Sequence, residues 1–187
     1  MSGLPQDDEI SFRPLAEADL LLMHRWLATE HVSAWYPIDD VPKPPIELVR
    51  SHYLPMTRGD DRTLGFIICL NGRPIGFIQA YMVRDHSEYA AAVQVEDGGA
   101  GVDLFIGEED AVHKGLGPRV LRRFLRDVVF GELGATLCII GPQPENGSAI
   151  RAYEKAGFKY LKTVRPPGSP GAGDEYLMQI EPSALPL

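Results

Sequence analysis

The sequence predicts an α/β fold in which helices cover both sides of one mixed β-sheet. Two apolar runs flank Asn71-Gly72, as expected for an antiparallel hairpin with a two-residue turn. Residues 101–107 have the pattern of a strand that leads through a glycine-rich turn into an amphipathic helix. The nearly continuous apolar run at residues 135–140 is typical of a central strand covered on both faces. Strands and helices therefore alternate, as in a layered α/β protein.

Size and composition predict one globular domain over residues 1–187. A chain of 187 residues is long enough for a full core and short for two domains. The net charge of -8 argues against a nucleic-acid partner, because a phosphate backbone requires clustered lysine and arginine. The acidity either attracts a cationic ligand or only keeps the protein soluble.

Cys69 and Cys138 each lie within an apolar strand pattern, so we expect two free thiols in the core. The polar, acidic amino terminus lacks the basic and apolar regions of a signal peptide. No stretch approaches the roughly 20 apolar residues that span a bilayer. We therefore expect a cytoplasmic protein with no membrane partner.

The first half of the chain is expected to form a strand, helices and the hairpin. Apolar residues recur at helical spacing in residues 18–27, and Glu17 and Asp19 suit the positive end of the helix dipole. Prolines exclude regular structure at residues 39–45. The other expected elements are a strand at 10–13, a short helix or irregular turn at 31–37, a short helix at 47–53, hairpin strands at 63–70 and 74–82, and a functional loop at 83–100.

The second half is organised around the glycine turn that follows the strand at 101–107. Gly115 and Gly117 allow a tight bend and the close approach of an anion, and Pro118 suits the first turn of a helix. A free helix amino end attracts phosphate, so the turn predicts an anion site. The other expected elements are an amphipathic helix at 119–130, a strand at 135–140, a helix at 148–156 stopped by Gly157, and a last antiparallel pair at 158–164 and 174–180.

Two motifs resemble the GNAT acetyltransferase superfamily. The turn at residues 112–117 is similar to the pyrophosphate signature of that superfamily. More specific is Asn146 followed by Ala149-Ile150-Arg151-Ala152-Tyr153-Glu154-Lys155-Ala156-Gly157-Phe158. The resemblance covers almost the whole chain and implies a twisted, mostly antiparallel sheet with one splayed parallel pair and helices on both faces.

Within the superfamily, the chain is similar to the aminoglycoside 6'-N-acetyltransferases. The matching segments are Trp26-Leu27, Trp35-Tyr36, Tyr53-Leu54-Pro55, residues 70–76, Gly101-Val102-Asp103, residues 114–117 and residues 149–158. Val112 departs from the Gln or Arg that opens the pyrophosphate signature, which removes a side-chain contact but leaves the backbone N–H groups. The resemblance implies an acetyl-CoA-dependent enzyme that acetylates a primary amine of an aminoglycoside antibiotic, at the 6' position, by direct attack in a ternary complex, and so confers resistance.

The resemblance also implies where acetyl-CoA binds. The residues expected at the pyrophosphate are His113, Lys114, Gly115, Leu116, Gly117 and Pro118. The pantetheine arm would pair with Leu104, Phe105 and Ile106, where a backbone N–H would face the thioester oxygen. Asn146 and Ala149 begin a helix that faces the same cleft, and Asn146 either bonds the pantetheine or caps that helix. Without ligand contacts, the side chains of His113 and Lys114 would only be part of a solvated turn.

Asp103 and Tyr153 are the expected catalytic residues. The phenol of Tyr153 is protonated at neutral pH and is suited to be the general acid toward the thiolate, although a packed tyrosine is the alternative. Asp103 lies in an otherwise apolar strand, where a carboxylate requires a cation or a cleft. By resemblance it contacts the acceptor amine as orienting group or general base, and a structural salt bridge is the alternative.

Acidic and aromatic residues are expected around the acceptor. Glu96 and Asp97 resemble residues that hold the sugar ammonium groups, or else form a solvated loop. Trp35 and Tyr36 would give a flat wall for the sugar rings, or else belong to the core. Asp174 and Glu175 would extend the acidic rim. The histidines and cysteines lack the spacing of a metal site, so we expect no metal.

Three other functions remain open from the sequence. They are acetylation of hydroxylysine in siderophore biosynthesis, acetylation of protein amino termini, and non-catalytic binding of acyl-CoA or aminoglycosides. The expected partner is a small cationic molecule, and the protein is either a monomer or a homodimer.

Overall fold

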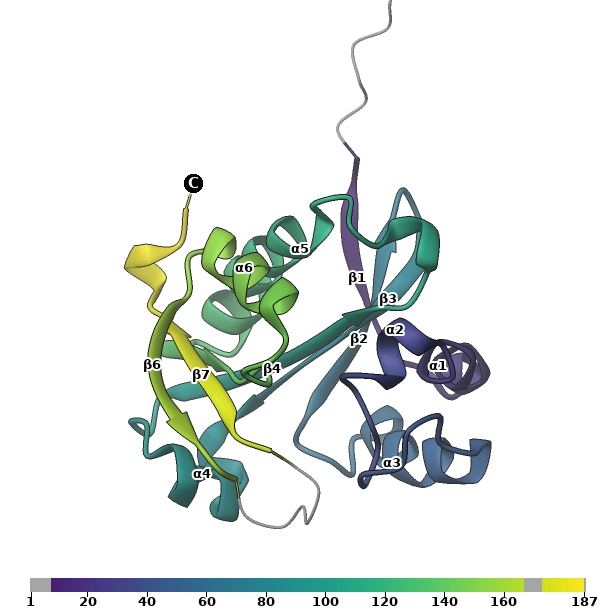
Figure 1. The fold of residues 1–187 in the computed structure, drawn as a ribbon, viewed down its shortest axis with the longest axis horizontal. Helices are drawn as coiled ribbons and strands as arrows, with labels where there is room; N and C mark the ends of the chain where they lie inside the picture. Colours follow the sequence, from purple (N-terminus) through teal and green to yellow (C-terminus); the bar gives the residue numbers. More distant parts are fainter. Residues whose placement is uncertain (1–7, 167–172, 187) are drawn as a thin grey trace, which may run out of the picture.

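A computed structural model describes residues 8–166 and 173–186 and contains one seven-stranded sheet within them. The strands are β1 (Ile10–Pro14), β2 (Leu64–Leu70), β3 (Arg73–Met82), β4 (Gly99–Ile106), β5 (Leu137–Ile140), β6 (Lys159–Val164) and β7 (Glu175–Ile180). Their order is β1-β2-β3-β4-β5-β7-β6 (Figure 1). All neighbours are antiparallel except β4 and β5, which confirms the expected mixed sheet.

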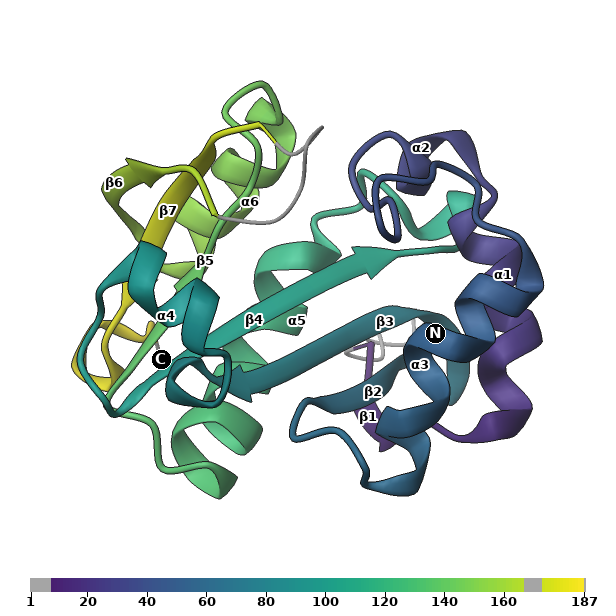
Figure 2. The ribbon, with the colours of Figure 1, turned by 90° about the horizontal axis from the view of Figure 1, so that it is seen from below.

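The parallel pair separates shortly after it forms. Three residue pairs join β4 to β5, the last of them Gly101 with Ile139. Beyond that pair β4 continues to Ile106 while β5 turns away, and Figure 2 shows the two strands diverging. The free edge of β4 therefore faces a gap in the sheet.

Helices cover both faces of the sheet, as expected (Figure 1). They are α1 (Leu20–Leu27), α2 (Glu30–Ser33), α3 (Ile46–Arg58), α4 (Ser87–Val93), α5 (Leu116–Phe124) and α6 (Gly147–Ala156). Phe77 of β3 packs in the core formed with α1 and α3, whereas the next residue, Ile78, packs in the core formed with α5 and α6. This alternation is the two-residue period of a strand buried on both sides.

The expected hairpin between β2 and β3 is confirmed. Asn71 and Gly72 have φ angles of 52° and 79°, the positive values that a tight two-residue turn requires. A register shift adds a bulge to β3, since Ile68 pairs with Gly76 and Cys69 with Pro74, so that Ile75 is the extra residue. Cys69 and Cys138 are both buried and free, as expected.

The expectation of a loop throughout residues 83–100 is wrong. A 3-10 turn (Val83–Asp85) and helix α4 occupy most of it, and β4 begins at Gly99. Three consecutive alanines favour the helix, and Val93 at its end is buried against Leu137, Ile139 and Leu177. The helix therefore closes the face of the sheet beneath β5 and β7.

Two other helices differ from their expected form. Helix α3 continues through Pro55 to Arg58, because the carbonyl that loses its N–H partner belongs to Ser51, which is exposed to solvent. The helix after α5 widens into a π-helix (Leu125–Glu132), which buries both Val128 and Val129.

None of the helices in residues 8–166 and 173–186 has the length and apolar character that crossing a membrane requires.

Candidate active site

Two cavities meet in the gap where β4 leaves β5. The first has a volume of about 490 Å³ and lies between α2, β4, the glycine turn and α6. The second has a volume of about 340 Å³ and lies between β4, the end of β5 and the start of β7. The residues that line both cavities are Trp35, Tyr36, Leu104, Asn146 and Tyr153. Two ligands in these cavities would therefore lie in contact.

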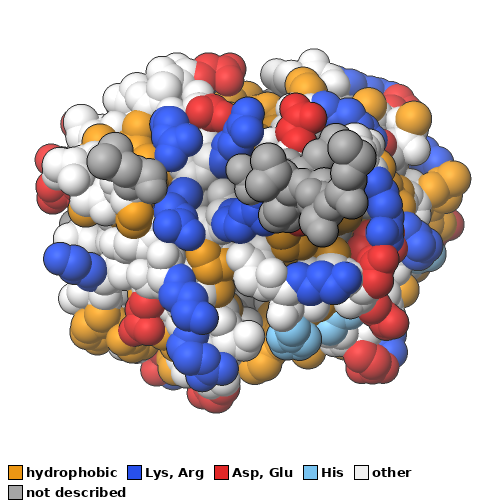
Figure 3. Space-filling view, turned by 90° about the horizontal axis from the view of Figure 1, so that it is seen from above, with side chains coloured by type: hydrophobic (Ala, Val, Ile, Leu, Met, Phe, Trp, Pro, Cys, Tyr) orange, Lys and Arg blue, Asp and Glu red, His pale blue; other side chains and the backbone are white. Residues whose placement is uncertain are grey.

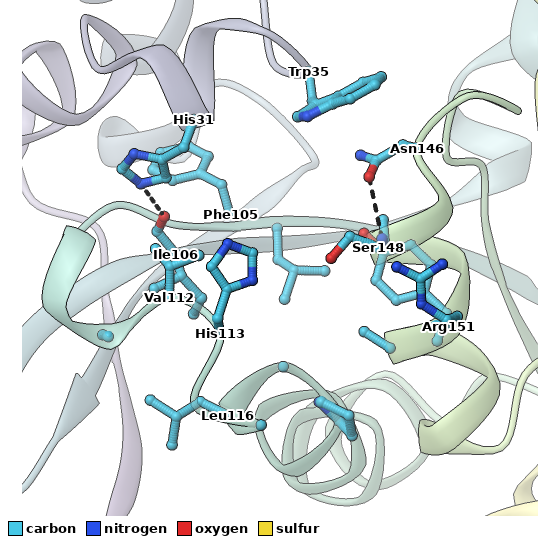
Figure 4. A pocket seen from close by; sticks show the side chains of 18 of the residues that line it. His31, Trp35, Phe105, Ile106, Val112, His113, Leu116, Asn146, Ser148 and Arg151 are labelled. Atoms are coloured by element: carbon cyan, nitrogen blue, oxygen red, sulfur yellow. Dashed lines mark hydrogen bonds between the residues drawn. The ribbon is translucent and has the colours of Figure 1, made fainter.

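The glycine turn forms the floor of the first cavity (Figure 4). His113 and Gly115 adopt left-handed φ angles of 61° and 72°, and α5 begins directly after them. Within the described chain, the amides of residues 113–117 donate no backbone hydrogen bond. These donors and the positive helix end together form an anion site. Of the predicted turn residues, Lys114 is the one that does not line the cavity.

The edge of β4 forms the side of the first cavity with Leu104, Phe105 and Ile106. Its other edge pairs with β3, so the backbone groups toward the gap remain available for strand-like pairing. A ring nitrogen of His31 lies 3.0 Å from the carbonyl oxygen of Ile106, which ties α2 to the end of β4 (Figure 4).

Helix α6 begins at the opposite wall. The Asn146 side-chain oxygen accepts a hydrogen bond of 3.1 Å from the Ala149 N–H, so the capping role is the one observed (Figure 4). Asn146 and Ala149 both line the cavity, together with Arg151 and Lys155, which the sequence did not indicate. The face that α5 and α6 present in Figure 3 carries many lysine and arginine side chains, so an anionic ligand would meet positive charge there.

Asp103 lies in the second cavity, on β4. The side-chain N–H of Gln79 donates to its carboxylate at 3.0 Å, and no described lysine, arginine or histidine forms an ion pair with it. Burial raises the pKa of Asp103, and the Gln79 hydrogen bond opposes that rise. The alternative of a structural salt bridge is therefore not found among the described residues.

Tyr153 lies at the junction of the two cavities. Its ring packs near Phe158, with ring centroids 6.3 Å apart, and it lines both cavities. Burial and then the charge of Asp103 raise the pKa of the phenol. The hydroxyl consequently stays protonated and available as a donor at neutral pH.

Trp35 and Tyr36 form the roof of the gap, but in different ways. Trp35 is 40% exposed, whereas Tyr36 packs edge-on against Phe105 with ring centroids 5.0 Å apart. Trp35 is therefore a surface wall, and Tyr36 is the margin of the core.

The structure does not bring Glu96 and Asp97 to either cavity. They lie before the first residue of β4, at the end where β4 and β5 are paired rather than where they separate. The Glu96 carboxylate accepts from the Thr136 hydroxyl at 3.2 Å, and Arg84 bonds the backbone carbonyl of Asp97. The family resemblance gave their approximate place along the chain, but not the end of β4 at which the gap opens.

Asp174 and Glu175, by contrast, both line the second cavity. Asp174 accepts a hydrogen bond of 2.8 Å from Arg165. Glu175 accepts one of 3.0 Å from the hydroxyl of Tyr89 on α4, and burial together with Asp103 raises the pKa of Glu175 to about 7. The described lining of this cavity therefore holds three carboxyl groups and no basic side chain.

Gln79 and Tyr89 are two further residues at the site that the sequence did not identify. Gln79 could have been found, since it is the polar residue within the apolar strand β3 and is paired in register with Asp103. Tyr89 gave no such signal, because its contact with Glu175 joins residues 86 positions apart. In residues 8–166 and 173–186, no three or more His, Cys, Asp or Glu side chains cluster as a metal site would require.

Comparison with known proteins gives consistent matches. The model of the acetyltransferase (GNAT) domain matches residues 16–165. The aminoglycoside N(6')-acetyltransferase type 1 of Klebsiella pneumoniae is 30% identical over 173 residues, which cover 92% of this chain and 84% of that protein. A kanamycin resistance protein of Rhizobium radiobacter is 33% identical over 86 residues, covering 46% of this chain and 76% of that protein.

Solved structures agree with these matches. The aminoglycoside acetyltransferase AAC(6')-Ib in complex with ribostamycin and coenzyme A superimposes with a TM-score of 0.84 at 29% identity, over 95% of this chain and 96% of that one. Its complex with paromomycin and acetyl-CoA gives a TM-score of 0.82 at 30% identity, over the same shares of the two chains. With its splayed sheet, its free helix amino end and these relatives, the chain belongs to the GNAT acetyltransferase family.

Proposed function

We propose that this protein transfers the acetyl group of acetyl-CoA to a primary amine of an aminoglycoside, at the 6' position. The observation that carries the proposal is the contrast between the two cavities. One has a floor of free amides at a helix amino end, and the other is lined by carboxyl groups without a basic side chain in the described residues. An anionic donor and a cationic acceptor suit the two cavities respectively.

Acetyl-CoA fits the first cavity. The amides of residues 113–117 would hold the pyrophosphate, and the pantetheine would pair along the free edge of β4 at residues 104–106. Asn146, Ala149 and the turn residues through Pro118 would enclose it from the other wall. Lys114 would act through its charge rather than by direct contact, since it lies outside the lining.

The reaction would proceed by direct attack. The acceptor nitrogen must first lose a proton, which Asp103 would accept directly or through a water molecule. The free amine then forms a bond to the carbonyl carbon of the thioester, and the carbon–sulfur bond breaks. The departing thiolate would take the proton of the Tyr153 hydroxyl, which its raised pKa keeps protonated until that step. As the amide forms, the nitrogen would lose its second proton through water, and this proton would restore the Tyr153 hydroxyl. Asp103 would release its proton to solvent.

The product would explain antibiotic resistance, because an amide replaces an ammonium group and removes one positive charge from the drug. We propose that the reaction occurs in the cytoplasm, where acetyl-CoA is available, and that residues 1–187 act as one domain. Kanamycin and ribostamycin are reasonable acceptors, since relatives are named for or solved with them.

Release of the CoA thiol, measured with acetyl-CoA and separate acceptors, tests this function. Kanamycin should give release well above the rate without acceptor, and hydroxylysine should not. Bacteria that express the protein should also survive more kanamycin than the same strain with Tyr153→Phe. Release with hydroxylysine alone would favour the siderophore-type activity, and release with neither, despite coenzyme A binding, would favour a binding module.

A further inference from the structure

We propose that Glu175 binds a second ammonium group of the acceptor, so that the acceptor is held between two carboxylates on opposite walls of the gap. This inference rests on the proposed function and adds a specificity-determining residue to it. Glu175 lies on β7, far from Asp103 in sequence, yet both line the second cavity.

The register of the sheet places the two carboxylates on opposite sides of the gap. The last pair that joins β4 to β5 is Gly101 with Ile139. Asp103 and Gly141 each lie two residues beyond it, on either side of the opening. The side chain of Glu175 covers Gly141, because a Cβ atom on that glycine would lie 2.3 Å from the Glu175 Oε2 atom. Because Gly141 has no side chain, the Glu175 carboxylate can occupy this space.

Tyr89 fixes the orientation of this carboxylate. Its hydroxyl donates to Oε2 of Glu175 at 3.0 Å, and its ring packs edge-on against Tyr81 with centroids 6.2 Å apart. The other oxygen, Oε1, accepts no hydrogen bond from the described side chains and is not sealed from the cavity. One oxygen is therefore held by the protein, and the other is free for a ligand.

No positively charged side chain of the described residues forms an ion pair with Glu175. Asp103 faces Glu175 from β4, and the hydroxyls of Tyr81 on β3 and Tyr89 on α4 are neutral. Asp174 already accepts a hydrogen bond from Arg165. Residues 167–172, which lie outside the described ranges, include no lysine, arginine or histidine. A carboxyl group so placed favours a cationic ligand, which would in turn lower its pKa. An acceptor with several ammonium groups satisfies both carboxylates, whereas a single amine satisfies one.

Glu175→Gln tests the charge, since glutamine keeps the shape of the side chain. At about pH 8 the KM for kanamycin should rise about ten-fold while kcat stays within about two-fold, because the lost contact is to a charged group remote from the reacting nitrogen. Glu175 has a raised pKa of about 7, so below that pH the wild-type carboxyl group becomes neutral. The ratio of variant to wild-type KM should therefore approach one near pH 6. Asp97→Asn, an exposed change outside both cavities, is the matched control.

Gly141→Ala tests the position of the carboxylate without changing any charge. The added methyl group would displace Oε2 and should also raise the KM for kanamycin at about pH 8. Because both changes act on one contact, the KM of the double variant for kanamycin should be no higher than that of the more affected single variant. Coenzyme A binding, which uses the other cavity, checks that each variant is folded.

Calorimetric titration with two ligands separates this inference from the proposed function. Wild-type protein loaded with coenzyme A should bind kanamycin more weakly after either change, while 6-amino-6-deoxyglucose, which carries one amine, should bind all forms alike. If wild-type protein releases CoA thiol with kanamycin but both variants keep the wild-type KM and affinity, the role of Glu175 is refuted and the function stands. If wild-type protein neither binds nor acetylates kanamycin, both proposals fail.

Discussion

Tyr153 lies where the two cavities join, and its surroundings keep its proton in place. Burial disfavours the phenolate, and the nearby carboxyl group of Asp103 disfavours it further. A tyrosine that acts as general base would need surroundings that stabilise the phenolate and lower the pKa of the phenol. Tyr153 therefore enters the reaction protonated, as a general acid must, and is not available as the base for the acceptor.

Tyr153→Phe should lower kcat about 100-fold, which is within the range for loss of a general acid. The ring would remain packed near Phe158, so the KM values for acetyl-CoA and kanamycin should change less than about two-fold. Steady-state kinetics with both substrates measure this, and Tyr160→Phe, at a side chain that is 51% exposed, is the control. A variant with the kcat of the wild type would remove the proposed role.

Asp103 shows a conflict between stability and chemistry. Its pKa is raised, so the folded protein holds the proton more tightly than the unfolded chain does. The ionised carboxylate therefore destabilises the fold at any pH above the unfolded value of about 3.9, and fully so above the raised folded value.

Asp103→Asn should consequently raise the free energy of unfolding by about 1 kcal/mol at about pH 7.5, while acetylation falls strongly. The gain in stability should disappear near pH 3.5, where the Asp103 carboxyl group of the wild type is mostly protonated in both the folded protein and the unfolded chain. Urea unfolding at the two pH values measures the change in the free energy of unfolding. The control Asp97→Asn should leave that free energy unchanged at both pH values. A loss of stability at the higher pH would contradict this account of the burial.

At the scale of elements, the glycine turn and α5 form the part of the site that is most locally encoded. Gly115 has a φ angle of 72°, and a Cβ atom there would touch nothing within 4 Å. Its backbone conformation, rather than packing, therefore requires glycine. Gly134 is a matched position, with a φ angle of 62°, equally open surroundings and no place in either cavity.

Gly115→Ala and Gly134→Ala should each lower the free energy of unfolding by about 1 kcal/mol, because both force alanine into the left-handed region. Gly115→Ala alone should raise the KM for acetyl-CoA several-fold, since its methyl group enters the first cavity. Equal KM values in the two variants would argue against pyrophosphate binding at this turn. Thermal unfolding and steady-state kinetics give both quantities.

Helix α4 is the element that the sequence did not predict, because little in its own residues marks a helix. Its seven residues contain few large apolar side chains, so no helical stripe marks it. The helix is held by Val93 in the core and by the contact of Tyr89 with Glu175 on β7. Both depend on strands that lie later in the chain, whereas α6 is marked by its own cap and its closing glycine.

The whole molecule separates its charges by surface. The chain is acidic, with a net charge of -8, yet the face over α5 and α6 carries many basic side chains (Figure 3), and the acceptor cavity has only carboxyl groups among its described charges. Each cavity thus presents the sign of charge opposite to that of its proposed ligand.

Salt should weaken the binding of the acceptor as a result. Raising sodium chloride from about 0.05 M to about 0.5 M should raise the KM for kanamycin several-fold, since screening shortens the range of the carboxylate field. The KM for 6-amino-6-deoxyglucose, which has one charge, should rise less. A KM for kanamycin that does not depend on salt would contradict an electrostatic basis for recognition.

The sequence alone determined the features that depend on neighbouring residues. The Asn71-Gly72 turn, the tight bend at Gly115 and the helix from Asn146 to Gly157 follow from φ preference, periodicity and capping, and all three are present in the structure. Asp103 and Tyr153 were named from their motifs, and both line the second cavity.

Only the tertiary structure decided which acidic side chains face the acceptor cavity. Glu96 and Asp97 lie at the paired end of β4, whereas Glu175 enters the gap because β7 inserts between β5 and β6 and Gly141 leaves it room. The physical reason is that the gap forms where two strands from distant parts of the chain stop pairing. No local run of residues records that point, so the carboxylates around it could be assigned only after the strands were in place.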